Sequence, residues 1–195
     1  FIFMVSSLLV AGRVADRFGR RKIFLSGLLL YGVAGIMAGS LPVIWVLILA
    51  RSLQGIAIAM LSPSGLAMSL NEFPPSRRAY ALGVWGTIGA LTGLCGSPIA
   101  AGMIELFNWQ AIFILTAGFS LLILLAGFVV LSDEQEGNNQ LPIDWVSAII
   151  AVMAVGGLTL FLVQGQEWGF SSPVTLLCLC ISIISTPLLA RRNRT

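Results

Sequence analysis

Histidine is absent from the chain, and only 10% of the residues carry a charge. Without histidine, the three cysteines (Cys95, Cys178 and Cys180) lack the partners and the spacing of a zinc or iron site, so we interpret them as small packing residues. A soluble domain is excluded as well, because a chain that is 57% hydrophobic has too little polar surface to cover itself. These absences predict a membrane protein without a metal site.

The interior of the apolar runs also lacks aspartate and glutamate, so no acid–base pair is available there for catalysis. No cysteine has a neighbouring base that would activate it as a nucleophile. We therefore predict no catalytic residues and no enzymatic activity. The net charge of +3 does not indicate nucleic-acid binding, because every basic residue except Arg51 lies beside an apolar run rather than along an exposed face.

Apolar runs long enough to cross a bilayer, about 20 residues each, alternate with short polar breaks. They predict an all-α, polytopic transmembrane bundle, with spans at 1–11 (partial), 23–40, 43–70, 79–103, 109–131, 143–163 and 173–190. Because Phe1 lies inside the partial span and the chain stops soon after the last one, we expect a fragment of a longer protein.

Arginine and lysine occupy alternate loops of this arrangement. The basic segments 12–22, 77–78 and 191–194 are expected inside the cell, and the loops 41–42, 106–108 and 164–172, which have no basic residue, outside. The acidic loop 132–142 breaks the alternation, but acidic residues weigh little in the rule. It is also the most linker-like segment. We predict an N-terminal bundle over 1–131, a cytoplasmic linker over 132–142, an added helix pair over 143–190 and the start of a cytoplasmic loop over 191–195.

Residues 12–22 read Gly-Arg-Val-Ala-Asp-Arg-Phe-Gly-Arg-Arg-Lys, a short loop with five basic residues. This pattern resembles the signature loop between the second and third helices of the major facilitator superfamily of transporters. The resemblance implies a cytoplasmic loop that helps to hold the outward-facing state. The residues to which it gives this role are Gly12, Asp16, Arg17, Gly19, Arg20 and Arg21.

The physical chemistry of the loop is compatible with a latch. A carboxylate such as Asp16 is favoured at the positive end of a helix dipole, and Arg20 can form a bidentate pair with a carboxylate. Glu72, at the inner end of the span 43–70, is the expected partner. The alternative is a positive-inside anchor, which would explain the cations but neither the glycines nor Asp16.

Arg51 is the one charge well inside a predicted span, where a bare charge costs about 2.5–3.5 kcal/mol on insertion scales. The segment Arg51-Ser-Leu-Gln54-Gly55 resembles a second signature of the superfamily, which implies a link to proton transfer. Since a guanidinium stays protonated, Arg51 would tune a nearby carboxylate or water chain, with Gln54 one turn away. The structural alternative is an arginine that pins helices by binding backbone carbonyls.

Glycine recurs along the span 79–103, and Gly86, Gly89, Gly93 and Gly96 fall within about 80° of one another at helical spacing. With Ser97, Pro98 and Gly102 this segment resembles the third signature, that of antiporters, although Ser97 and Ala101 replace two expected glycines. The resemblance implies an exporter with a close-packed, kinked helix. Ordinary small-residue packing between membrane helices is the alternative.

The segments Trp109-Gln110-Ala-Ile-Phe113 and Gln166-Glu167-Trp168-Gly169-Phe170 resemble the fourteen-helix drug:proton antiporter branch, which has two extra helices between its halves. Both tryptophans fit an interfacial anchor equally well. On the resemblance, the chain lacks the first helix and the C-terminal bundle of the same protein.

The expected function is proton-coupled export of drugs or other amphiphilic small molecules across the cell membrane by alternating access. No cofactor is expected, because the proton gradient is the energy source. A major facilitator transporter of a metabolite is the alternative, and a membrane-embedded enzyme or receptor-like protein is a third class.

Overall fold

The computed structural model describes residues 11–131 and 145–192, and these residues are almost entirely helical. Residues 11–18 form a helix that is followed by α2 (Arg20–Ser40), α3 (Ile44–Asn71), a 3-10 turn (Pro75–Arg77), α4 (Arg78–Leu106), α5 (Trp109–Val130), α6 (Trp145–Trp168) and α7 (Pro173–Arg192). No strand occurs in the described part. Five helices are long and apolar enough to cross a membrane, and a further apolar helix over Pro173–Leu188 is shorter. The predicted all-α membrane architecture is confirmed.

The ends of α2 to α7 agree with the predicted spans to within a few residues, with two differences at loops that were predicted to lie outside the cell. α6 continues to Trp168 and ends before Gly169, whose φ of 84° leaves the helical region, so the loop predicted over 164–172 shortens to 169–172. α4 continues to Leu106. The helices therefore include Glu105 and Glu167 near their ends, because a polar residue ends a hydrophobic run without ending a helix. The partial span over 1–10 and the linker over 132–142 lie outside the described residues.

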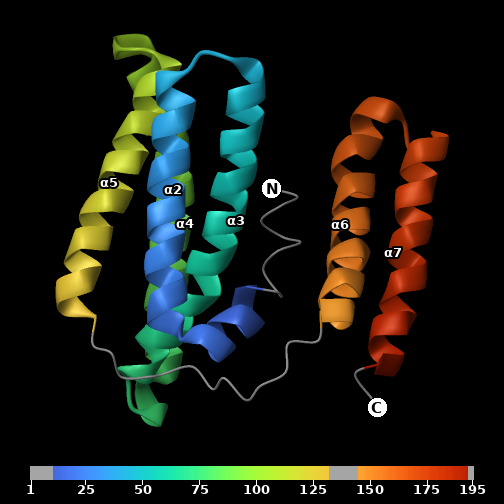
Figure 1. The fold of residues 1–195 in the computed structure, drawn as a ribbon, viewed down its shortest axis with the longest axis horizontal. Coiled ribbons are helices and arrows are strands. Elements are labelled where there is room, and N and C mark those ends of the chain that lie inside the picture. Colours follow the sequence, from blue (N-terminus) through green and yellow to red (C-terminus); the bar gives the residue numbers. More distant parts are fainter. Residues whose placement is uncertain (1–10, 132–144, 193–195) are drawn as a thin grey trace.

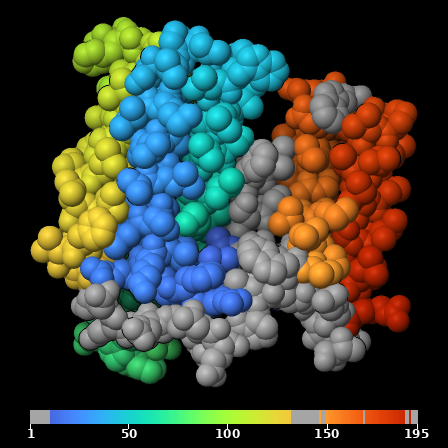
Figure 2. Space-filling model, viewed as in Figure 1, coloured from blue at the N-terminus to red at the C-terminus, as the bar shows by residue number. Residues whose placement is uncertain are grey.

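α2 is the centre of the N-terminal bundle and packs along its length against α3 on one side and α5 on the other. In Figure 2 the surfaces of α2 and α5 meet without a gap. α4 lies behind α2 in Figure 1 and contacts α3 and α5 at only a few positions. Successive helices alternate in direction, so the starts of α2 and α4, which carry Arg20 to Lys22 and Arg78, share the lower side of Figure 1. This shared side agrees with the alternation of basic loops.

Glycines on one face of α2 bring it close to α5. Gly32, Gly35 and Gly39 fall within about 60° of one another at 100° per residue. A Cβ added at Gly35 would lie 2.8 Å from Ala117 Cβ and 3.1 Å from the Phe113 carbonyl oxygen. The Ser120 hydroxyl, also on α5, donates a 2.8 Å hydrogen bond to the Leu28 carbonyl. Small residues and interhelical hydrogen bonds hold membrane helices together where the surrounding lipid is as apolar as the side chains.

α6 and α7 form a hairpin that contacts none of the other described helices. A Cβ added at Gly157 would lie 2.7 Å from the Cys178 carbonyl oxygen, so the two backbones nearly touch. The buried Ser182 hydroxyl donates a 2.7 Å hydrogen bond to the Ala154 carbonyl across the same interface. The two helices of the hairpin are therefore joined by their own contacts.

Candidate functional site

The loop at 12–22 is a helix broken at one residue. Residues 11–18 are helical, Gly19 has φ 96° and ψ 129°, and α2 starts at Arg20. A φ of this sign strains any residue with a Cβ, which explains why glycine stands at position 19. Gly12 has nothing within 4 Å of where a Cβ would be, so no contact of the described residues requires glycine there.

Two charged side chains of the predicted loop form an ion pair. Arg20 donates hydrogen bonds of 3.1 Å from Nε and 3.0 Å from Nη2 to one carboxylate oxygen of Asp16. The pair is partly exposed, with side-chain accessibilities of 31% and 50%. An exposed ion pair adds only about 0–1 kcal/mol to stability, so it is easily exchanged for another partner.

A second arginine ties the loop to α5. Arg21 Nη2 donates a 3.2 Å hydrogen bond to the Phe128 carbonyl oxygen in the last turn of that helix. The last carbonyls of a helix carry the negative end of its dipole and attract a cation. Arg21 thus attaches the segment to α5, and the Asp16–Arg20 pair joins the helix over 11–18 to the start of α2. Arg17 lies 5.5 Å from the centroid of the neighbouring Phe18 ring.

Glu72 is placed differently from the expectation. It is the exposed C-cap residue of α3 and forms no ion pair with any residue of the described ranges. Arg20 pairs instead with Asp16, four residues earlier in the chain, a spacing at which side chains along a helix meet. The expected contact between Arg20 and Glu72 is therefore not made in this structure.

Arg51 projects from α3 over an aromatic ring of α5. Its guanidinium carbon lies 4.4 Å from the centroid of Phe113. Within the described part of the chain it forms no hydrogen bond or ion pair, so it does not bind the backbone carbonyls that the structural alternative requires. Gln54 is only 4% exposed, and its side-chain oxygen has no hydrogen-bond partner among the described residues. Gly55 beside it is buried.

The glycine stripe of α4 is not a packing face in this structure. At Gly86, Gly89, Gly93 and Gly96 an added Cβ would meet nothing within 4 Å, and the same holds at Gly102. Ser97 and Pro98 are exposed, with Pro98 inside the helix. The close approach of helices that the sequence predicted for α4 occurs instead between α2 and α5.

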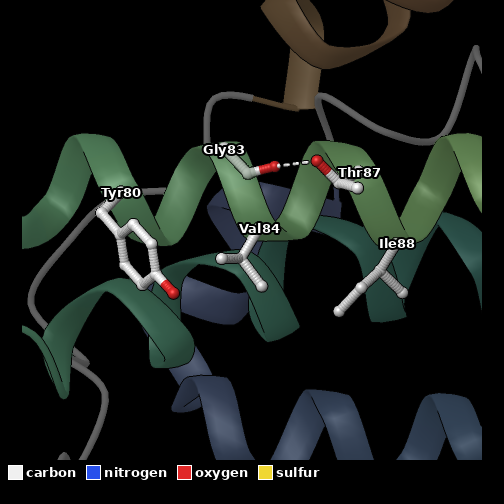
Figure 3. A pocket seen from close by; sticks show the side chains of 5 residues that line it. All are labelled: Tyr80, Gly83, Val84, Thr87 and Ile88. Atoms are coloured by element: carbon white, nitrogen blue, oxygen red, sulfur yellow. Dashed lines mark hydrogen bonds between the residues drawn. The ribbon is translucent and has the colours of Figure 1, made fainter.

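The surface of α4 also carries a shallow open groove of about 330 Å³, shown in Figure 3. Tyr80, Val84 and Ile88 extend from one face of the helix, spaced by one turn. Thr87 donates a 2.8 Å hydrogen bond to the Gly83 carbonyl, so its hydroxyl proton is already used. The lining is mainly apolar and comes from a single helix, so the groove is an open surface rather than an enclosed site.

Two features of the site escaped the sequence analysis. Phe113 was noted only as part of a family pattern, although its ring contacts Arg51. The α2 glycines were overlooked, although Gly32, Gly35 and Gly39 have the same helical periodicity as the stripe on α4. Their recurrence at intervals of three and four residues is the sequence signal that identifies them.

Comparison with known proteins shows the family of the chain. The model of the Major Facilitator Superfamily matches residues 1–194. The tetracenomycin C resistance and export protein of Streptomyces glaucescens is 30% identical over 181 residues, which are 92% of this chain and 33% of that protein. The probable multidrug resistance protein EmrY of Escherichia coli is 27% identical over 179 residues, 90% of this chain and 35% of that protein.

A third relative has a similar name and extent. The multidrug export protein EmrB of Haemophilus influenzae is 30% identical over 174 residues, 88% of this chain and 34% of that protein. The chain thus spans about a third of the length of these three relatives. With the family model matched along nearly the whole chain and apolar helices of membrane-spanning length, this multi-pass membrane protein belongs to the Major Facilitator Superfamily.

Proposed function

We propose that the chain is part of a secondary transporter that exports amphiphilic small molecules across the cell membrane in exchange for protons. The observation that carries the proposal is the placement of Arg51, a permanent charge well inside a span. Among the described residues, Arg51 contacts an aromatic ring and not a carboxylate. A charge retained inside a membrane helix points to an ion or substrate pathway. The printed names of the relatives, which are resistance and export proteins, support drugs or antibiotics as the substrate class.

The proposed cycle needs no cofactor and no covalent chemistry, because the proton gradient supplies the energy. Two helix bundles would rock about a site near the middle of the membrane, as in other transporters built from repeats. Arg51 keeps its proton and acts through the field that it imposes on a proton-carrying group. The loop around Gly19 would act as the latch, with the exposed pair of Asp16 and Arg20 released and re-formed as the bundles move.

The proposal is tested by ethidium efflux from energised cells that express the full-length protein. We expect efflux that a protonophore abolishes, and Arg51→Ala should lower the rate about a hundredfold if the charge is required for coupling. Ser52→Ala is the matched control, because Ser52 only bonds back to the Ile48 carbonyl of its own helix. Protonophore-insensitive efflux, or full activity of Arg51→Ala, would contradict proton coupling through Arg51.

A metabolite transporter of the same superfamily is the second candidate. It is favoured by Ser97 and Ala101, which stand where the antiporter signature has glycine. Correct membrane insertion of the full-length protein without any ethidium efflux would select this candidate.

The latch makes a separate prediction for Asp16→Asn. The substitution keeps the size of the side chain but removes the charge that Arg20 binds, so we expect transport to fall about ten- to a hundredfold. Membrane insertion and thermal stability should stay unchanged, because the ion pair is exposed. Glu105→Gln, which removes an exposed carboxylate at the opposite end of the bundle, is the control. Normal turnover of Asp16→Asn would contradict the latch.

A further inference from the structure

Phe113 and Arg51 form a contact between two helices that are remote in sequence. Arg51 is on α3, Phe113 is on α5, and the guanidinium carbon lies 4.4 Å from the ring centroid. A cation within about 6 Å of a ring face is attracted by the negative potential of that face. Phe113 is only 6% exposed, whereas Arg51 is an exposed residue.

The ring is held in place from three directions. It belongs to one buried cluster with Ala38 of α2 and Ala50 of α3, both fully buried. Trp109, one turn earlier on α5, packs edge to face against it with centroids 5.9 Å apart. Gly35 lies against the backbone of Phe113, since an added Cβ would come within 3.1 Å of its carbonyl oxygen. The face that Arg51 meets is therefore fixed relative to α2 and α3.

The other arginine–ring contact in the described part of the chain lacks these supports. Arg17 and Phe18 are neighbours in sequence, and the Arg17 guanidinium carbon lies 5.5 Å from the centroid of the Phe18 ring. Phe18 is 48% exposed. Such a contact follows from adjacency alone. The contact of Arg51 instead depends on the α2–α5 interface, which places the ring.

We propose that Phe113 is the positioning residue for Arg51: its ring face holds the guanidinium at a fixed place along α3, where the arginine acts on the proton-coupled step. This inference rests on the proposed function, in which Arg51 tunes a proton-carrying group. It also gives the charge inside a span a favourable contact although no acidic partner lies among the described residues, because a ring face attracts a cation.

A fluorine series at position 113 separates the ring's charge distribution from its shape. Nonsense suppression in the full-length transporter can place phenylalanine with one, two or three ring fluorines at this position. Each added fluorine weakens the negative potential of the ring face and leaves the volume of the side chain nearly unchanged. We expect the maximal rate of ethidium efflux to fall stepwise, reaching a loss of about three- to tenfold with three fluorines. KM for ethidium should stay within about twofold, because the change acts on coupling rather than on substrate binding.

The control is the same series at Phe119, which is on α5 and 58% exposed, and no decline is expected there. If Phe113→Leu abolishes efflux while the fluorinated variants keep the wild-type rate, the ring is packing material only and the proposal is wrong.

A second measurement tests the contact without transport. In detergent, the trifluorinated ring should lower the melting temperature of the protein with Arg51 but not that of the Arg51→Gln protein. Equal shifts in both backgrounds would overturn the proposal. If the wild type moves no ethidium, the proposed function fails, and this cycle still decides whether Phe113 holds Arg51.

Discussion

Leucine at position 35 is expected to destabilise the N-terminal bundle strongly. Gly35 faces α5 at a point where even a Cβ would come within 2.8 Å of Ala117 Cβ and 3.1 Å of a backbone oxygen. A branched side chain there must push α2 away from α5 and break the hydrogen bond from Ser120 to Leu28. Overpacking of this kind costs about 1–3 kcal/mol or more.

The measurement is the yield of monodisperse protein after detergent extraction, followed by thermal unfolding. Gly118→Leu is the matched control, since Gly118 lies on α5 with nothing within 4 Å of an added Cβ. We expect Gly35→Leu to lose most of the folded protein, or about 10 °C in melting temperature, and Gly118→Leu to behave as wild type. Equal behaviour of the two variants would contradict the α2–α5 interface.

Leucine at position 157 is expected to open the α6–α7 hairpin and leave the N-terminal bundle intact. Gly157 lies against the Cys178 carbonyl oxygen, which belongs to the backbone and cannot move without moving α7. Separation of the helices also breaks the hydrogen bond from Ser182 to the Ala154 carbonyl. Because α6 and α7 contact no other described helix, the damage should stay within the hairpin.

The thiols of the chain provide the readout. Cys178 lies on the hairpin and is partly buried, whereas Cys95 lies exposed on α4. With Cys180 replaced by alanine, we expect Gly157→Leu to raise the maleimide-labelling rate of Cys178 about tenfold and to leave that of Cys95 unchanged. Faster labelling at both positions would mean that the bundle and the hairpin unfold together.

The order and approximate ends of α2 to α7 could be predicted from sequence because the bilayer imposes a minimum length of apolar helix. The helix over residues 11–18 was instead predicted as part of a loop. The exact outer ends could not be predicted. α6 continues past its last apolar run until Gly169, and α5 begins where the Asn108 side chain accepts a 3.0 Å hydrogen bond from the Ala111 amide. Each of these helix ends depends on a single residue, which is harder to recognise in a sequence than a run of hydrophobic residues.

The contents of the site were only partly predictable. Asp16 and Arg20 have the i,i+4 spacing at which helical side chains meet, yet Glu72 was expected as the partner. The glycines of α4 illustrate the limit, because periodicity defines a face but does not say what covers it. The contact of Arg51 with Phe113 joins two helices whose relative placement depends on the α2–α5 packing. No pattern within either segment contains that information.

The self-contained hairpin has a consequence for how chains of this family can change length. Its two helices run in opposite directions, so α7 returns the polypeptide to the side of the membrane from which α6 leaves. Gain or loss of such an even-numbered unit preserves the orientation of every helix encoded after it, whereas gain of a single helix would invert them all. Since none of the described bundle helices packs against α6 or α7, gain or loss of the pair would remove no packing partner from them.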